Sequence, residues 1–587
     1  MSGQLPKRFL PGRVEEPADL KHMWEIIRKV YGEQPFFTYK NPKEKSVRDI
    51  SYNQMYDIIQ RLGTAFSKIG VMGKTVAILS ETRYEWLASY FAAVNGNGIV
   101  VPLDKELAEE QVINFIERAK VTCVVYSESF AGLIENYAKN TDKEPSPEKT
   151  AAVFINLDLE PDKQFLPEYK DYNIYSFENL MKAGEDALND KCTDFTGVEI
   201  DREKPCAYLF TSGTTGTSKA VMLSHKNIAS NAYNAACCVQ VLSKDKIVAV
   251  LPAHHTYETT CTFMAAPMLG SQTCQNESLK MVMRNFQFYK PDKLVLVPLF
   301  VDNIVKKIWD EIEKKGKTKT VRNAIKLSNG LRKAGIDLRR KLFKDILGAF
   351  GGRLNAIICG GAPLNPEHIK TLDAFGVTIW QGYGITECSP LVSVIPDGMH
   401  MKKIGSVGHP VFQNEVKIGE KDENGNGEIL VKGSNVMLGY LDNEEATKEV
   451  FTDDGFFKTG DIGYLDGDGY IYITGRKKNI IILSNGKNIY PEEIEEYLYK
   501  IEGIKECAVI GRKKDGGGDN ITALVFPDLE SGKFGGKDFK EAEAKIKEDI
   551  DNINRQLPVF KQITEVEVRE TEFEKTTTKK IIRYKLK

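Results

Sequence analysis

The amino-acid sequence predicts an α/β protein with a large N-terminal domain of stacked, mostly parallel sheets, a small β subdomain, and a small α+β domain at its C-terminal end. Short apolar runs alternate with helically spaced apolar residues over the first 400 positions, which favours parallel strands joined by helical crossovers. Gly and Asp become dense between about residues 400 and 475, as in hairpins or a small barrel. A third pattern begins after Gly475 and has the length of a separate small domain.

The expected strands and helices follow one another in a regular order. Residues 76–79 form an apolar run, residues 87–94 are apolar at helical spacing, and residues 99–103 form the next run, which predicts a βαβ unit. Later runs with strand character are residues 123–126, 247–251, 294–297, 355–358 and 377–380. The Gly- and Asp-rich part predicts strands at residues 428–431 and 470–474. In the last part we expect a helix from Pro491, another over residues 539–556, and strands at residues 507–510, 521–526 and 566–568.

The composition excludes several classes of protein. The 587 residues include 80 Lys and Arg against 82 Asp and Glu, and this balance argues against a nucleic-acid binder, which is usually basic. Ten cysteines without a CxxC pair argue against structural zinc and favour reduced, buried thiols in a cytoplasmic protein. The uncharged stretch at residues 259–276 is interrupted by Pro267 and Gly270, so no transmembrane segment is predicted. A peripheral membrane contact and the oligomeric state stay open.

The strongest local motif is a loop rich in Gly and in hydroxyl side chains. It joins two predicted strands, residues 207–210 and 220–223, and consists of Thr211, Ser212, Gly213, Thr214, Thr215, Gly216, Thr217, Ser218 and Lys219. Glycines let backbone N–H groups approach an anion, hydroxyls donate hydrogen bonds and Lys219 adds a positive charge, a combination that suits phosphate. The residue order differs from that of the Walker loop. A polar hairpin tip is the alternative interpretation.

A second motif directly follows the apolar run at residues 377–380. It contains Gln381, Gly382, Tyr383, Gly384, Thr386 and Glu387. Ligands bind at the carboxyl ends of the strands in open parallel sheets, so Tyr383 is a candidate for stacking on a base. Thr386 and Glu387 are candidates to hold Mg²⁺ and the phosphate that it bridges. An ordinary strand-to-helix turn is the alternative.

Three further patterns contain charged or metal-ligating side chains. Asp461 and Arg476 suit the hydroxyl groups of a ribose, and residues 466–469 are interpreted as a hairpin turn because the rest of a calcium loop is missing. The tail at residues 574–583 is basic and, by composition alone, a solvated end. His254 and His255 follow a predicted strand, on which adjacent side chains point to opposite faces, so they are not expected to share a metal ion.

Taken in this order, the motifs resemble those of the adenylate-forming superfamily of acyl-CoA synthetases, adenylation domains and luciferases, over residues from about 50 to 583. Gly360, Gly361 and Ala362 match a further motif of that superfamily, and so does Lys580 in the tail. The resemblance implies a large AMP-binding domain over residues 1–475, with its β-rich subdomain at about 400–475. It also implies a hinge at residues 476–478 that includes Lys478, and a small mobile domain over residues 479–587.

The resemblance implies an enzyme with two half-reactions. A carboxylate attacks the α-phosphate of ATP and releases pyrophosphate, and the thiol of coenzyme A then attacks the acyl-adenylate and releases AMP. Lys580, Thr386, Glu387 and His255 are the expected catalytic residues, with Mg²⁺ at Glu387. The expected contacts of the nucleotide are Thr211, Ser212, Gly213, Thr214, Thr215, Gly216, Lys219, Gly360, Gly361, Ala362, Gln381, Gly382, Tyr383, Gly384, Thr386, Asp461 and Arg476.

Within that superfamily, residues 251–258 resemble the Leu-Pro-x-x-His-x-x-Glu segment of long-chain fatty acyl-CoA synthetases, and the long helical insert at residues 304–350 is also similar. This resemblance predicts a long-chain fatty acid as substrate, with His255, Tyr257 and Glu258 in its pocket. The alternatives are a free-standing adenylation enzyme for an aryl or amino acid, an acyl-AMP ligase that loads a carrier protein, and a nucleotide sensor without catalytic activity.

Overall fold

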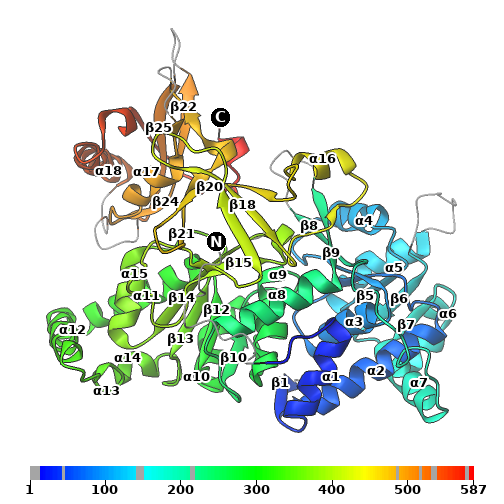
Figure 1. Ribbon diagram of the computed structural model, residues 1–587. Helices are drawn as coiled ribbons and strands as arrows, with labels where there is room; N and C mark the ends of the chain where they lie inside the picture. The colour runs from blue at the N-terminus through cyan, green and yellow to red at the C-terminus, as the bar shows by residue number, and fades with distance from the viewer. Residues whose placement is uncertain are drawn as a thin grey trace. The chain divides into compact units, whose positions relative to one another are not determined.

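The computed structural model describes residues 14–41, 46–140, 151–211, 218–483, 488–513, 519–529, 534, 538–575 and 581–586 (Figure 1). The chain divides into two compact units. The first unit contains the residues up to 211 together with residues 218–415 and 432–449. The second unit contains residues 416–431 and the chain from residue 450 onward.

One large sheet of the first unit has eight strands in the order β19-β9-β8-β4-β3-β5-β6-β7. Its parallel strands are β3 (Thr75–Leu79), β4 (Ile99–Pro102), β5 (Cys123–Tyr126), β6 (Val153–Asn156), β7 (Ile174–Ser176) and β8 (Pro205–Thr211). Strands β9 (Lys219–Ser224) and β19 (Gly439–Tyr440) extend the sheet in antiparallel pairing. The intervening helices are α3 (Tyr84–Asn95), α4 (Glu109–Arg118), α5 (Ala131–Asn140), α6 (Pro167–Lys170) and α7 (Phe177–Asn189). The predicted βαβ unit is therefore confirmed as β3-α3-β4.

The other large sheet has nine strands in the order β16-β15-β14-β13-β12-β10-β11-β1-β2. Its parallel strands are β14 (Thr378–Gly384), β13 (Ala356–Cys359), β12 (Lys293–Leu296), β10 (Lys246–Ala249), β11 (Gln272–Gln275) and β1 (Pro35–Asn41). Antiparallel strands close both edges: β2 (Ser46–Ser51), β15 (Leu391–Val394) and β16 (His409–Pro410). The helices α1 (Leu20–Tyr31), α2 (Tyr52–Lys68), α8 (His225–Cys238), α9 (Thr256–Thr260), α10 (Val282–Tyr289) and α15 (Pro366–Phe375) belong to the same unit.

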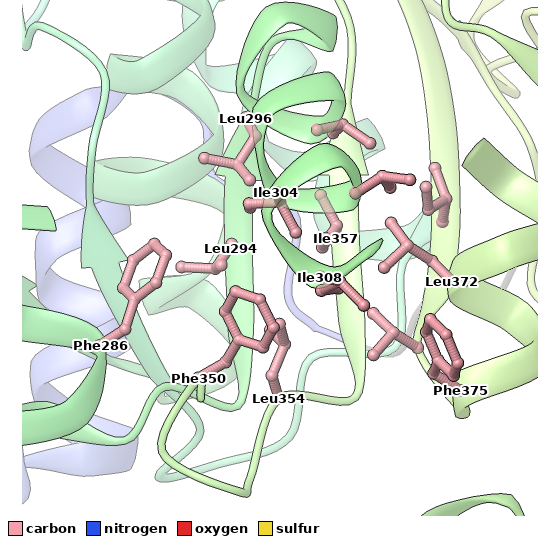
Figure 2. Packing of buried hydrophobic residues seen from close by; sticks show 14 of the residues in the cluster. Phe286, Leu294, Leu296, Ile304, Ile308, Phe350, Leu354, Ile357, Leu372 and Phe375 are labelled. Carbon is pink, nitrogen blue, oxygen red and sulfur yellow. The ribbon is translucent and has the colours of Figure 1, made fainter. Parts of the chain in front are cut away.

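The predicted helical insert is a series of four helices: α11 (Pro298–Lys314), α12 (Thr318–Lys333), α13 (Arg339–Leu342) and α14 (Lys344–Gly348). Figure 2 shows how α11 covers the nine-stranded sheet, with Ile304 and Ile308 pointing toward Leu294 and Ile357 on the neighbouring strands. These side chains are at most 7% exposed. Burial of this apolar layer, at about 25 cal/mol per Å², is the main force that holds α11 against the sheet.

Capping residues determine where several helices begin and end. Two helices begin with a capping box, in which the N-cap residue and the third helical residue exchange hydrogen bonds. In α2 these residues are Ser51 and Gln54, and in α8 they are Ser224 and Asn227. Helix α15 begins with Pro366 after the N-cap Asn365 and ends at Gly376, whose φ of +87° favours glycine. These signals fix where the helices begin and end relative to the strands that carry the motifs.

The second unit contains three small sheets. Strands β17 (Asn414–Ile418), β18 (Gly427–Gly433), β20 (Phe457–Leu465) and β21 (Ile471–Arg476) form one, and β22 (Ile481–Ile482) pairs with β23 (Asn488–Ile489). The third sheet, β24 (Ile504–Lys513), β25 (Asp519–Pro527) and β26 (Glu565–Val568), packs against α17 (Pro491–Leu498) and α18 (Phe539–Asn554) around an apolar core. The sequence-predicted strands and helices of this region are confirmed. Residues 466–469 form the expected turn, in which the Asp466 carboxylate accepts from the Asp468 and Tyr470 amides.

Two local expectations differ from the structure. The motif from Gln381 to Gly384 lies inside β14 and does not follow it, because Gln381 still pairs with β13 and the next three residues pair with β15. Strand β10 ends at Ala249, so His254 and His255 lie in a turn, and the argument from alternating strand faces does not apply to them. Their ring centroids are 5.9 Å apart.

The cysteines have the surroundings expected from the sequence. Within the described residues all ten cysteines are free thiols, and nine of them are buried. Among those same residues we find no helix that is both long and apolar enough to cross a membrane.

Candidate functional site

Strands β8 and β9 hold both ends of the Gly- and hydroxyl-rich loop. Thr211 pairs with Lys219 in the antiparallel ladder, and the Thr211 hydroxyl donates to the Lys219 carbonyl at 3.3 Å. Phe210 stacks on Phe115 with centroids 3.9 Å apart, and Arg118 lies over the Phe210 ring while it donates to the Ser218 carbonyl. Ser212, Gly213, Thr214, Thr215 and Gly216, which we expect to contact phosphate, lie outside the described residues.

Tyr440 brings together two of the predicted site residues. Its hydroxyl donates to Oε1 of Glu387 at 3.0 Å, and the Lys219 ammonium lies 4.6 Å from the centre of its ring. Tyr440 is 6% exposed, and burial, followed by the charge of Glu387, raises the pKa of its phenol far above the ordinary value. The phenol therefore stays protonated at neutral pH and acts as a hydrogen-bond donor to the carboxylate.

The turn that carries Thr386 and Glu387 is fixed by side chains from three other segments. Asn231 of α8 and Asn435 both donate to the Cys388 carbonyl, and Thr260 donates to the Ser389 carbonyl at 3.1 Å. Gly384, at the end of β14, has no room for a side chain, because a Cβ there would lie 2.3 Å from the Pro390 carbonyl oxygen. Thr386 and Glu387 themselves are half-buried, so their side chains remain accessible on a rigid backbone.

The motif Gly360, Gly361 and Ala362 follows β13 at the carboxyl edge of the same sheet. Gly361 has a φ of +88°, and a Cβ on Gly360 would lie 3.1 Å from the Gly382 carbonyl oxygen, so the two glycine motifs are in close contact. The Tyr257 hydroxyl lies at this edge of the sheet and donates to the carbonyls of Leu296 and Ile358. Gln381 and Tyr383, also on β14, are 6% and 7% exposed.

A narrow cavity lies beside the Thr386–Glu387 turn. It leaves about 10 Å³ for the centre of a water molecule, which is room for one water. It is lined by apolar residues of the eight-stranded sheet and of α8, and by a group of hydroxyl and imidazole side chains; together these are Tyr90, Pro102, Leu209, Leu223, Ile228, His254, Thr256, Thr259, Thr260, Met264 and Ser389. Any ligand larger than water therefore enters only after these side chains move.

The imidazole in this cavity belongs to His254, whereas the sequence motif predicted a role for His255. Its Nε2 lies 3.5 Å from Oδ2 of Asp104, a residue just after β4. Burial lowers the pKa of His254, and the nearby Asp104 only partly offsets that effect, so the ring is neutral at pH 7. His255 is the N-cap residue of α9. No sequence pattern links Asp104 to His254, because Asp104 follows a strand of the eight-stranded sheet and His254 follows a strand of the nine-stranded sheet.

Glu258 is fully buried, and it is not among the residues that line the cavity. Neither of its carboxyl oxygens makes a hydrogen bond of ordinary geometry to a described residue. Burial raises the pKa of this carboxyl well above its usual range, and the nearby Thr262 hydroxyl only partly offsets it. Glu258 is therefore a neutral acid in the interior of the first unit.

Asp461 and Arg476 meet in the second unit. They are opposite each other in the β20–β21 ladder, and the Arg476 guanidinium contacts Oδ1 of Asp461 at 2.6 Å. The Asp461 side chain is nearly buried, and its amide donates to the Thr459 hydroxyl. Lys478 lies in the turn directly after β21. Partial burial, followed by the charge of Arg476, lowers the pKa of Lys478 to about 8.

The tail residue Lys580 lies outside the described residues, whereas the residues on both sides of it are well anchored. Lys575 and Ile581 form an antiparallel bridge. Arg583 pairs with the buried Glu495 at 2.5 Å and donates to the Val509 carbonyl at 3.2 Å. Phe573 and Leu586 pack on Ala508 and Leu524. The second unit thus holds the tail on the face of its three-stranded sheet.

The described residues contain no cluster of three or more His, Cys, Asp and Glu side chains that could hold a metal ion by themselves. Glu387 is a single accessible carboxylate. Mg²⁺ is usually bound through one or two carboxylates plus phosphate oxygens, so this arrangement fits a magnesium ion that arrives with a nucleotide.

The chain matches two family models. Residues 27–441 match the AMP-binding enzyme family, and residues 478–587 match the AMP-binding enzyme C-terminal domain. A long-chain-fatty-acid–CoA ligase of Rattus norvegicus is 26% identical over 95% of this chain and 84% of its own length.

Solved structures of CoA ligases share the fold. An anthranilate CoA ligase bound to anthranoyl-AMP aligns with a TM-score of 0.73 at 20% identity, covering 98% of each chain. The o-succinylbenzoate coenzyme A synthetase of Bacillus subtilis, bound to ATP and magnesium, aligns with a TM-score of 0.67 at 20% identity, covering 96% of this chain and 98% of that one. These matches confirm the resemblance drawn from the motifs, and this chain belongs to the AMP-binding enzyme family.

Proposed function

We propose that this protein is an ATP-dependent acyl-CoA ligase, which activates a carboxylic acid as an acyl-adenylate and transfers the acyl group to coenzyme A. The observation that supports this most directly is Tyr440, which joins the carboxylate of Glu387 to the ammonium of Lys219 through one buried side chain. Phosphoryl-type transfer depends mainly on positioned charges, and a fixed cation beside a fixed carboxylate suits a nucleotide that carries its own metal.

The first half-reaction assigns a role to each of these residues. Lys219 and the hydroxyls of residues 211–217 hold the leaving pyrophosphate, and Thr386 donates to the α-phosphate. Glu387, oriented by Tyr440, binds the Mg²⁺. The metal neutralises phosphate charge when it is bound. Lys580 bridges the attacking carboxylate and the α-phosphate, which lowers the repulsion between two anions.

The remaining motifs complete the nucleotide site in this proposal. Residues 360–362 and 381–384 contact the adenine and its sugar, with Tyr383 against the base. Asp461 and Arg476, an ion pair in the structure, hold the ribose. The division into a domain over residues 1–475, a hinge at residues 476–478 and a mobile domain over residues 479–587 belongs to the same proposal, because a second half-reaction needs Lys580 to leave the phosphate.

For the acid we propose a long-chain fatty acid. The Leu-Pro-x-x-His-x-x-Glu segment supports this, as does the name of the Rattus norvegicus relative. The chain would occupy the cavity beside His254 after flexible apolar side chains such as Met264 move aside. A smaller aryl acid is the second candidate, and the observation in its favour is the polar lining contributed by Thr256, Thr259, Thr260 and Ser389.

The experiment is an assay of both half-reactions over a series of acids. ATP–pyrophosphate exchange is measured with straight-chain acids of increasing length and with benzoates, and thioester formation is followed with coenzyme A. We expect exchange and thioester formation with the longer chains. Absence of exchange with every acid would favour the nucleotide sensor, and exchange without thioester would favour a different acyl acceptor.

Substitution Lys580→Ala tests the assignment of the tail. We expect adenylation to fall by about 10²–10³, because one preorganised charge is lost from the transition state. Thioester formation from supplied acyl-adenylate should continue at the normal rate. Lys579→Ala is the matched control and should leave both steps unchanged. Normal pyrophosphate exchange in Lys580→Ala would return the tail to its interpretation as a solvated basic end.

A further inference from the structure

The helical segment at residues 317–344 differs in charge from the rest of the chain. It contains ten Lys and Arg residues and one acidic residue, Asp337. The whole chain has a net charge of −2, so the remaining residues carry −11. Helix α12, most of this segment, contains no acidic residue. Figure 1 shows α12 at the outer edge of the first unit, beside α13 and α14.

The charges of α12 form a stripe on its outward face. Lys319, Lys326 and Lys333 follow one another at intervals of seven residues, which is close to two full turns, so they project from the same side. All three are exposed. The opposite side of the helix packs on the core through Val321, Ala324 and Ile325 and carries the buried Ser328. On this side Arg332 also pairs with Asp373.

Aliphatic side chains are exposed within the same segment. Leu327 on α12 is 61% exposed, Ile336 in the following turn is 48% exposed, and Leu342 on α13 is 43% exposed. Lys341 and Lys344 are exposed beside Leu342. The only aromatic residue of the segment, Phe343, is buried. A basic helix with exposed aliphatic residues at its flank is typical of a surface that binds at a membrane interface.

We propose that residues 317–344 form a docking surface for an anionic lipid bilayer. The stripe of lysines faces the lipid phosphates and carboxylates, and Leu327, Ile336 and Leu342 enter the boundary between head groups and acyl chains. Single-stranded nucleic acid is a weaker candidate, because such sites combine positive charge with exposed aromatic side chains for base stacking, and the described residues of this segment expose none. The proposal is independent of which acid the enzyme activates.

The test is sedimentation of the full-length protein with lipid vesicles. We expect binding to phosphatidylcholine vesicles that contain about 30% phosphatidylserine, weaker binding at high salt, and little binding to phosphatidylcholine alone. The variant Lys319→Glu/Lys326→Glu/Lys333→Glu should lower the vesicle partition coefficient by about tenfold or more. Leu327→Gln, which keeps the charge, should lower it several-fold and leave the salt dependence unchanged.

The matched control is Lys74→Glu/Lys182→Glu/Lys191→Glu, which changes the net charge equally at three exposed lysines elsewhere in the first unit. It should keep vesicle binding. Both triple variants should keep ATP–pyrophosphate exchange, which reports folding; if the stripe variant unfolds, the corresponding glutamine variant replaces it. Equal loss in the two triple variants, no preference for the anionic lipid, or stripe-dependent binding of a single-stranded RNA without vesicle binding would each overturn the proposal.

Discussion

At the scale of single residues, Tyr440 is the side chain on which the proposed nucleotide site depends most. It lies 53 positions from Glu387 in the sequence and hydrogen-bonds it in the structure. The buried phenol stays protonated at neutral pH, because burial and the charge of Glu387 raise its pKa. Tyr440 therefore fixes the orientation of a carboxylate on a turn whose next two carbonyls are held by Asn231, Asn435 and Thr260.

We predict that Tyr440→Phe slows adenylation by roughly tenfold and raises the Mg²⁺ concentration needed for half-maximal exchange. A hydrogen bond to a charged group is worth about 1.5–3 kcal/mol, and part of that orients Glu387. The measurement is pyrophosphate exchange over a magnesium titration. Tyr464→Phe, on a residue stacked on Tyr472 in the second unit, is the control and should behave as wild type. An unchanged magnesium dependence in Tyr440→Phe would mean that the bond has no functional role.

At the scale of elements, a buried carboxylate joins the helical insert to α15. Asp373 on α15 is nearly buried and accepts hydrogen bonds from Arg332, Arg339 and His400. Burial by itself would raise the pKa of Asp373, but the hydrogen bonds of His400 and Arg332 and the charges of both arginines lower it to about 2. The folded state thus favours the ionised carboxylate.

We predict that Asp373→Asn lowers the stability of the first unit by about 2–3 kcal/mol at pH 7. Because the folded pKa is depressed, the stabilisation is fully present above about pH 4 and is lost as the pH falls toward 2. The measurement is the urea midpoint at pH 7 and at pH 3, where the difference between wild type and variant should fall to about half of its value at pH 7. Asp337→Asn removes a more exposed pair with Arg339 and should cost less than about 1 kcal/mol. Equal effects of the two substitutions at pH 7 would contradict this account.

At the scale of the whole molecule, the two half-reactions require different groups at one phosphate. In the proposed mechanism Lys580 serves adenylation and must leave before the coenzyme A thiol can attack. The turn Lys477–Asn479 joins β21 to the part of the chain that carries the tail, so we propose that the backbone there changes conformation between the two steps.

We predict that Lys478→Pro, which restricts φ to about −65°, leaves adenylation measurable and slows thioester formation strongly. Single-turnover assays would follow pyrophosphate release and thioester separately. Lys478→Ala is the control: it removes the ammonium, keeps the backbone free, and should leave thioester formation close to normal. If proline slowed both steps to the same extent, or neither, the hinge would have to lie elsewhere.

Most elements of the fold could be predicted from the sequence, because strand runs, helical spacing and caps are local. The β8–β9 pair around the Gly-rich loop, the small sheets after residue 414 and the helices α17 and α18 are examples. The ends predicted for β10 and β14 were wrong, because the length of a strand depends on the neighbour with which it pairs. The basic stripe on α12 was not predicted, because the acidic residues elsewhere balance its positive charge in the net charge of the chain.

The sequence by itself determined the family and located the motifs proposed to bind the nucleotide, since those residues are contiguous and their chemistry follows from residue type and spacing. Only the tertiary structure decided which side chains meet. Tyr440 with Glu387, His254 with Asp104, and Asp373 with two arginines are contacts between distant segments. The protonation of Tyr440, His254 and Glu258 also depended on the fold. The physical reason is that contacts and burial depend on how strands and helices pack, and packing joins residues that no local pattern connects.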